Sequence, residues 1–172
     1  VSTVRIVDDG NFGFTEVGIL DDNNPDNTGF AMDDRVTAQD ADGDRARWRF
    51  TNLPDGRYRV SVTYLENARA FDTANDAVFM VSDVNGELVT TSVDQTVAPS
   101  SLSDAGFLWG DLITITSLTG GELTIDLLDH DSTGQATDRF VIADAVRVER
   151  LFDEVQDATM IVDGIEIADD TG

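Results

Sequence analysis

The chain has 172 residues, enough for one domain with a short appendage and for a sizeable apolar core. It contains no cysteine, which excludes disulfide bonds, thiolate metal sites and cysteine nucleophiles. Its 34 acidic residues against 11 basic ones give a net charge of −23, so nucleic acid and anionic membranes would be repelled and are poor partners. No apolar run approaches the ~20 residues that a membrane-spanning helix needs.

Short β-branched runs broken by Gly, Asp, Asn and Pro predict an all-β fold, because helix-period patterns are hard to find. Ala46 to Leu53 alternates apolar residues with Arg, and Gly56 to Leu65 alternates in the same way. The turn Pro54 to Gly56 lies between them. We therefore expect a hairpin with rows of Arg facing outward.

The remaining predicted strands have similar lengths and are separated by legible turns. They are Val4 to Val7, Ala77 to Ser82, Leu88 to Val93, Asp111 to Ser117, Glu122 to Leu127 and Phe140 to Glu149. The parity of the last strand changes near Ala145, which predicts a bulge or burial on both faces. Strands at this spacing predict a two-sheet jelly-roll β-sandwich.

The chain after Arg150 differs from what precedes it. A polar connector leads to Thr159 to Asp169, a short hairpin pattern with Asp163–Gly164 as a type I′ turn signal. An isolated hairpin is marginal in water, so this one would need a partner. We expect a sandwich over residues 1–150, and over 151–172 a linker and terminal β segment that starts a following module or adds a strand to a neighbouring subunit.

Several stretches together carry a family resemblance: Val4 to Phe14, Ala46 to Tyr64, Val93 to Pro99, Trp109 and Phe140 to Arg150. They resemble the golvesin and xanthan-lyase carbohydrate-binding-like domain, a galactose-binding-like jelly roll of secreted bacterial proteins, notably planctomycete ones. The resemblance implies that Phe140 to Arg150 is the closing strand and runs beside the first. It also implies an extracellular or cell-surface location and a polysaccharide or glycan as partner.

Two sets of carboxylates are candidate calcium sites. Asp8, Asp9 and Asp144 would meet if the first and last strands pair, and carboxylates forced together repel unless a cation or a proton relieves them. Separately, Asp40, Asp42 and Asp44 alternate around Gly43 like the opening of a calcium loop. The bidentate Glu of such a loop is missing, because position 51 is Thr51. The alternative for both sets is a solvated acidic surface.

Aromatic residues in loops are candidates for sugar binding, because an aromatic ring suits the apolar face of a sugar. The candidates are Trp109 and Phe107, with Phe71 and Arg69 in a loop that is longer than its family counterpart. Packing in the core or at its rim is the alternative for Trp109, whereas Trp48 alternates with Phe50 and is expected in the core.

No catalytic set stands out in the sequence. The single histidine, His130, lies between two aspartates in a polar loop, and nothing marks a nucleophile beside it. We therefore expect no enzyme. Two hypotheses remain: a noncatalytic, calcium-stabilised, carbohydrate-binding module, or a structural subunit of an extracellular fibre or stalk that assembles through its terminal β segment.

Overall fold

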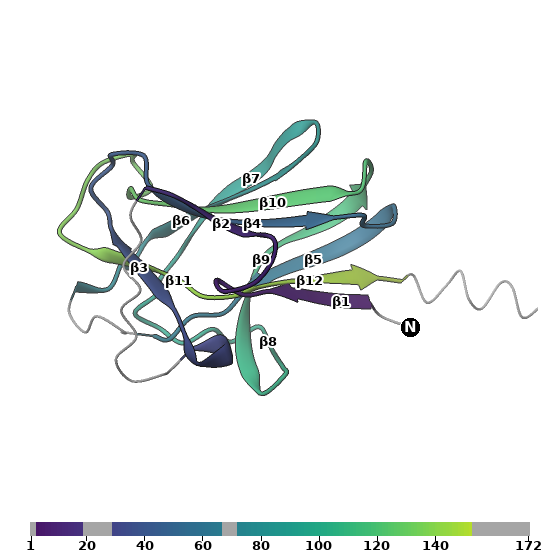
Figure 1. The fold of residues 1–172 in the computed structure, drawn as a ribbon, viewed down its shortest axis with the longest axis horizontal. Coiled ribbons are helices and arrows are strands. Elements are labelled where there is room, and N and C mark those ends of the chain that lie inside the picture. Colours follow the sequence, from purple (N-terminus) through teal and green to yellow (C-terminus); the bar gives the residue numbers. More distant parts are fainter. Residues whose placement is uncertain (1–2, 19–28, 67–71, 153–172) are drawn as a thin grey trace, which may run out of the picture.

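The computed structural model describes residues 3–18, 29–66 and 72–152. Two five-stranded antiparallel sheets pack face to face (Figure 1). The first sheet has the order β1 (Thr3–Val7), β12 (Val146–Leu151), β5 (Gly56–Val62), β9 (Phe107–Leu118) and β8 (Leu102–Asp104). The second has the order β2 (Phe14–Val17), β4 (Arg45–Thr51), β10 (Glu122–Leu128), β6 (Ala77–Asp83) and β7 (Gly86–Val93).

A small third sheet, β11 (Phe140–Ala143) with β3 (Arg35–Ala38), lies at one end of the sandwich (Figure 1). A helical turn, η1 (Phe30–Met32), precedes β3. Among the described residues no helix has the length and apolar character that crossing a bilayer requires. The predicted all-β, two-sheet jelly-roll sandwich is confirmed.

The core lies between the two main sheets, and the alternation of each strand supplies it. Trp48 and Phe50 on β4 face Val60 and Val62 on β5, and each is at most 1% exposed. The Arg side chains of β4 point outward, as predicted. Period-two patterning thus identified both strands and their faces correctly.

The predicted hairpin between these two strands is wrong. β4 pairs with β2 and β10 in the second sheet, whereas β5 pairs with β12 and β9 in the first. The turn Pro54 to Gly56 carries the chain from one sheet to the other, and the hydroxyl of Tyr58 donates to the Pro54 carbonyl at 2.5 Å. Both strands turn their apolar faces to the same interior, so they pack across it and do not pair edge to edge.

The predicted last strand is divided in two at Asp144 and Ala145. β11 pairs with β3, whereas β12 pairs with β1 and β5. The change of parity near Ala145 therefore marks a change of sheet and is more than a bulge. Ala145 still accepts a backbone hydrogen bond from Thr63 at 3.0 Å.

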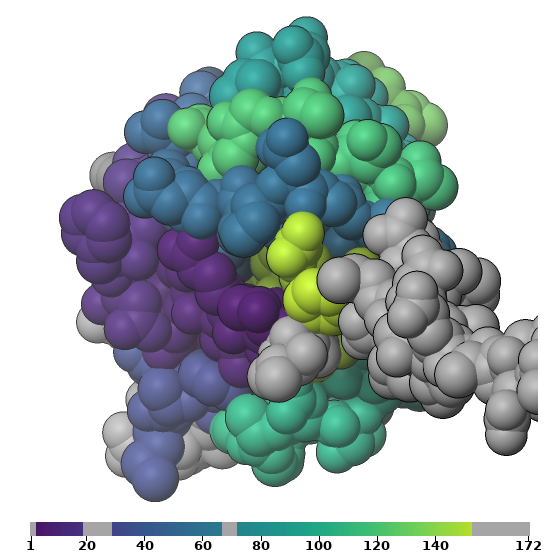
Figure 2. Space-filling view, turned by 90° about the vertical axis from the view of Figure 1, so that its right-hand side faces the viewer, coloured from purple at the N-terminus to yellow at the C-terminus, as the bar shows by residue number. Residues whose placement is uncertain are grey.

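The first and last strands are neighbours, as the family resemblance implied. β1 and β12 run antiparallel, with Thr3 opposite Arg150 and Val7 opposite Val146. Figure 2 shows the purple atoms of β1 beside the yellow-green atoms of β12 on this end of the molecule. The predicted hairpin Thr159 to Asp169 lies outside the described residues.

Candidate functional site

Acidic side chains from three segments gather where β1 meets β12 and β3 meets β11. Asp8 and Asp9 follow β1, Asp33 and Asp34 precede β3, and Asp144 stands in the break between β11 and β12. The two strand pairings bring these segments together. We call these five residues the terminal-strand cluster.

Three carboxylates of the cluster form its centre. Asp8, Asp9 and Asp33 each place one oxygen within 4.8 Å of the others. Their Oδ1 atoms are buried and have no hydrogen-bond partner in the described part of the chain. A buried carboxylate oxygen without a hydrogen-bond donor destabilises the fold, because it has lost its hydrogen bonds to water and receives none from the protein. The centre therefore needs a cation or protons.

Arg35 supplies part of the compensating charge. Its Nε lies 3.3 Å from Oδ2 of Asp9, and its Nη1 pairs with Glu16. Because the guanidinium is shared between two carboxylates, it does not neutralise the cluster.

The pKa values of the cluster reflect this excess of negative charge. Burial, with the neighbouring charge of Asp33, raises the pKa of Asp8 to about 6. Burial and the charges of Asp33 and Asp8 raise the pKa of Asp9 to about 7. Burial raises the pKa of Asp144 well above its ordinary value, although the Phe30 N–H that it accepts acts in the opposite direction.

Asp144 lies at the margin of the cluster and is already engaged. Both its carboxylate oxygens accept the backbone N–H of Phe30, at 3.0 and 3.1 Å, and its carbonyl accepts the indole N–H of Trp48 at 3.2 Å. Only glycine fits at Gly29 beside this contact, because a Cβ there would lie 3.3 Å from Oδ2 of Asp144 and 2.3 Å from the Asp33 carbonyl oxygen. The predicted trio of Asp8, Asp9 and Asp144 is thus brought close together, but Asp33 completes the central group.

The donor set of the cluster fits a hard divalent cation. Calcium takes about 6–8 oxygen ligands and tolerates irregular geometry. Asp8, Asp9 and Asp33 would hold it. Their Oδ1 atoms, which accept no hydrogen bond from the described residues, would supply the lone pairs. Sequence reasoning missed Asp33, although the pair Asp33–Asp34 before a strand repeats the Asp8–Asp9 pattern after one.

The second predicted set of carboxylates, Asp40, Asp42 and Asp44, does not form one group as expected. Asp40, Asp42 and Asp129 place one carboxylate oxygen each within 4.8 Å of the others, and Asp44 does not belong to this group. Asp129 is buried, and its Oδ2 accepts the backbone N–H groups of Gly43 and Asp44 at 2.9 and 3.0 Å. Asp129 therefore already stabilises the turn, and its distance in sequence from Asp40 hid it from sequence reasoning.

A pocket of 210 Å³ opens beside the terminal-strand cluster. Phe107 and Leu108 line it from the start of β9, together with residues that follow β5 and with Asp144 and Gly29. The ring of Phe107 packs at a tilt of 48° against that of Phe30, with 4.9 Å between centroids. Phe107 thus lies on a pocket wall, and its sugar-binding role stays a prediction.

Trp109 does not line this pocket surface. Its side chain is fully buried, its indole N–H donates to the Asp104 carbonyl at 3.0 Å, and its ring meets the edge of Phe30. This full burial fits the alternative of packing in the core or at its rim, and a sugar could stack on the ring only after rearrangement of the protein around it. Phe71 and Arg69 lie outside the described residues.

His130 belongs to a polar turn that is also tied to the rest of the fold, because its carbonyl accepts the side-chain N–H of Gln39 at 3.2 Å. Its Nδ1 lies 2.8 Å from the carbonyl oxygen of Asp131, and the Asp131 carboxylate accepts N–H groups from Thr133 and Gln135. These contacts organise the loop and place no nucleophile against the imidazole.

Comparisons with known proteins show which solved structures share this fold. No protein-family model and no curated protein matches the sequence. A Paenibacillus xanthan lyase superposes with a TM-score of 0.61 and 22% identity, over 87% of this chain and 13% of the lyase chain. The CBM35 of Cellvibrio japonicus Abf62 gives a TM-score of 0.52 at 15% identity, over 85% of this chain and 92% of its own.

A third structure, Xyl-CBM35 in complex with a disaccharide that contains glucuronic acid, gives a TM-score of 0.53 at 16% identity. It covers 83% of this chain and 91% of its own. The chain shares the jelly-roll fold of these modules. It spans only a small part of the lyase, and identities at this level establish the fold alone.

Proposed function

We propose that this chain is a noncatalytic carbohydrate-binding module of the golvesin and xanthan-lyase type, carried by a secreted or cell-surface bacterial protein and stabilised by calcium. The observation that carries the proposal is the position of the Phe107 pocket, next to Asp144 and the terminal-strand cluster, in a fold shared with two carbohydrate-binding modules.

The chemistry of the pocket suits a sugar. Phe107 offers an aromatic face, while Thr63 and Glu66 add polar groups to the same wall. Pockets that bind small molecules combine apolar walls with a few polar groups in this way. The volume of 210 Å³ lies below the range typical of drug-sized ligands, which favours a single sugar unit or a chain end.

Calcium has a structural part in this proposal. The cluster joins the beginning and the end of the sandwich, and its carboxylates repel one another in the absence of a cation. A cation bound by Asp8, Asp9 and Asp33 would hold the segment before β3 in place. It would thereby also hold Phe30, whose ring packs at a tilt against Phe107.

Affinity electrophoresis in gels that contain soluble polysaccharides tests the binding function. Wild-type protein should be retarded by at least one member of a panel of neutral galactomannan, arabinoxylan and hydroxyethylcellulose and acidic xanthan and pectin. Phe107→Ala should reduce retardation at the pocket beside the cluster, whereas Leu88→Ala, an exposed apolar residue on β7, should not. Thermal melting of both variants controls for loss of the fold. Absence of retardation in every gel would contradict the proposal.

The alternative, a fibre or stalk subunit, depends on Thr159 to Asp169, which lie outside the described residues. Sedimentation of the chain with and without residues 153–172 tests it. A monomer of unchanged stability after deletion would show that this segment assembles nothing.

A further inference from the structure

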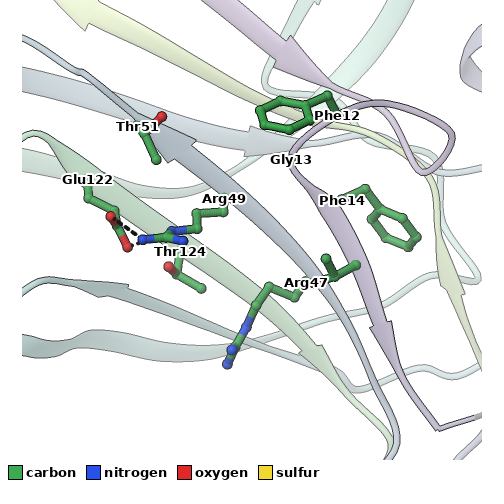
Figure 3. A pocket seen from close by; sticks show the side chains of 9 residues that line it. Phe12, Gly13, Phe14, Arg47, Arg49, Thr51, Glu122 and Thr124 are labelled. Atoms are coloured by element: carbon green, nitrogen blue, oxygen red, sulfur yellow. Dashed lines mark hydrogen bonds and ion pairs between the residues drawn. The ribbon is translucent and has the colours of Figure 1, made fainter.

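A second hollow, of 580 Å³, lies on the outer face of the β2–β4–β10 sheet. It shares no lining residue with the Phe107 pocket. Figure 3 shows Phe12 at its upper edge and the Arg49–Glu122 pair at its side, with Phe14 directed away from Phe12. A volume of this size lies within the range of ligand sites in proteins.

Phe12 is fully exposed although it is a large apolar residue, with a relative exposure of 102%. It occupies the tight turn between β1 and β2, in which Asn11 N–H donates to the Asp8 carbonyl and Phe14 N–H to the Asn11 carbonyl, both at 3.1 Å. Its neighbour Phe14 packs against Trp48, with 5.4 Å between ring centroids. The side chain of Phe14 therefore packs against the core, whereas that of Phe12 is exposed to solvent.

Gly13 fixes this turn against the sheet. Its carbonyl accepts the Arg49 N–H at 2.8 Å, its φ is +106°, and a Cβ there would lie 2.8 Å from the Arg49 carbonyl oxygen. Only glycine fits so close to β4 in that conformation. Phe12 is therefore presented beside the hollow by a backbone that is held in place.

The remaining lining is polar and electrically balanced. Arg49 binds both carboxylate oxygens of Glu122, at 2.8 and 2.7 Å, and Arg47 binds those of Asp126, at 2.6 and 2.8 Å. Each guanidinium uses Nε and Nη2, which leaves Nη1 without a hydrogen-bond partner in the described part of the chain. These pairs are held rigidly and still offer donors and acceptors to a ligand.

We propose that this hollow is a second sugar-binding site, in which Phe12 stacks on one unit of a neutral polysaccharide and Arg49 and Glu122 hydrogen-bond its hydroxyl groups. The inference rests on the proposed function, because it gives the same module a second binding face. A sugar ring has an apolar face for Phe12 and vicinal hydroxyls that match the paired donors and acceptors of an Arg–carboxylate pair.

Charge selects a neutral chain over an acidic one. Arg49 pairs with Glu122 on the wall of the hollow and Arg47 pairs with the buried Asp126 beneath it, so these charges are balanced, while the whole chain carries −23 and repels a polyanion. A protein partner fits less well, because Phe12 is surrounded by Thr, Arg and Glu side chains and not by a contiguous apolar patch.

The test uses affinity electrophoresis of the full chain in galactomannan and hydroxyethylcellulose gels, with xanthan as the acidic comparison. Phe12→Ala should weaken binding to a neutral polysaccharide about tenfold, as loss of a central contact residue does, and Phe12→Trp should retain it. Phe107→Ala is the matched control for the other pocket. Because Phe12 is fully exposed, its replacement should leave the melting temperature unchanged.

Other outcomes overturn the inference. Unchanged retardation of Phe12→Ala in neutral gels, or binding to xanthan alone, would remove the second site and leave the proposed function standing. Absence of retardation in every gel would remove both. A change in the sedimentation of Phe12→Ala without sugar would show instead that Phe12 joins copies of the chain.

Discussion

The backbone N–H of Phe30 donates to both carboxylate oxygens of Asp144, at 3.0 and 3.1 Å. Phe30 also packs at a tilt against Phe107, so one carboxylate connects the pocket wall with the buried centre of Asp8 and Asp9. Cation binding and sugar binding should therefore be coupled through this contact.

Calcium should stabilise the fold beyond the effect of ionic strength. At a free calcium concentration ~100 times the dissociation constant the gain is about 2.7 kcal/mol, visible as a higher melting temperature. Melting is compared in calcium, in chelator and in sodium chloride of matched ionic strength. Asp33→Asn should abolish the calcium response, whereas Asp42→Asn, in the other acidic group, should keep it. Identical curves in calcium and sodium would show that the cluster binds no calcium.

The calcium-free protein should lose stability as pH rises from about 4 to 7. The folded pKa values of Asp8 and Asp9, about 6 and about 7, lie above the value of 3.8 in an unfolded chain. Protons are thus bound more tightly in the folded state, and their contribution is complete below pH 4 and is lost as pH rises through 6 and 7.

Urea unfolding of metal-stripped protein at fixed ionic strength measures this pH dependence. Asp9→Asn should flatten the profile and raise stability at pH 7, because it removes one buried charge. Saturating calcium should flatten it too. A free energy of unfolding that rises steadily from pH 4 to 7 in metal-stripped protein would contradict the prediction.

Arg47→Met should destabilise the sandwich by about 3 kcal/mol, since it leaves the Asp126 carboxylate unpaired. Asp126 is fully buried, whereas the Arg47 side chain is 35% exposed, so the loss is smaller than for a fully buried pair. Replacing both residues, Arg47→Met with Asp126→Leu, should recover most of the stability. Denaturant unfolding of the single and double variants measures these losses. If the loss of unfolding free energy in the double variant equals the sum of the two single losses, the pairing is contradicted.

Trp48→Ala should cost about 3–5 kcal/mol of unfolding free energy, because it empties the centre of the core. Trp48 contacts Phe14 and donates its indole N–H to the Asp144 carbonyl. Trp48→Phe fills most of the space and should lose mainly the hydrogen bond, about 1 kcal/mol. A loss from Trp48→Ala within the range of surface substitutions would mean that the strand faces are misassigned.

Local alternation was a sufficient guide to several strands but not to their partners. The pattern around Trp48 and Val60 identified two strands and their buried faces correctly. It could not show that Pro54 to Gly56 crosses between sheets, because a hairpin and an arch leave the same alternation in each strand. Pairing depends on contacts distant in sequence, which periodicity does not contain.

The sequence predicted only those residues of the candidate site that the adjacency of the first and last strands brings together. Asp8, Asp9 and Asp144 follow from the meeting of the first and last strands. Asp33 and Asp129 do not, because the β3–β11 pairing brings in Asp33 and the β4–β10 pairing brings in Asp129, and the sequence pattern shows neither pairing. For Trp109 the sequence left sugar binding and packing open, because β9 alternates weakly, and its burial and its hydrogen bond to the Asp104 carbonyl favour packing.

The pairing of β1 with β12 also bears on how the chain reaches its native state. Residues at opposite ends of the sequence must meet before this pair can form, and such distant contacts slow folding. The carboxylates that follow β1 come together with Asp144 at the same step. We therefore expect a slow final phase in refolding, in which β1 pairs with β12. Calcium should accelerate this phase by stabilising the paired strands, and removal of residues 3–7 should eliminate it.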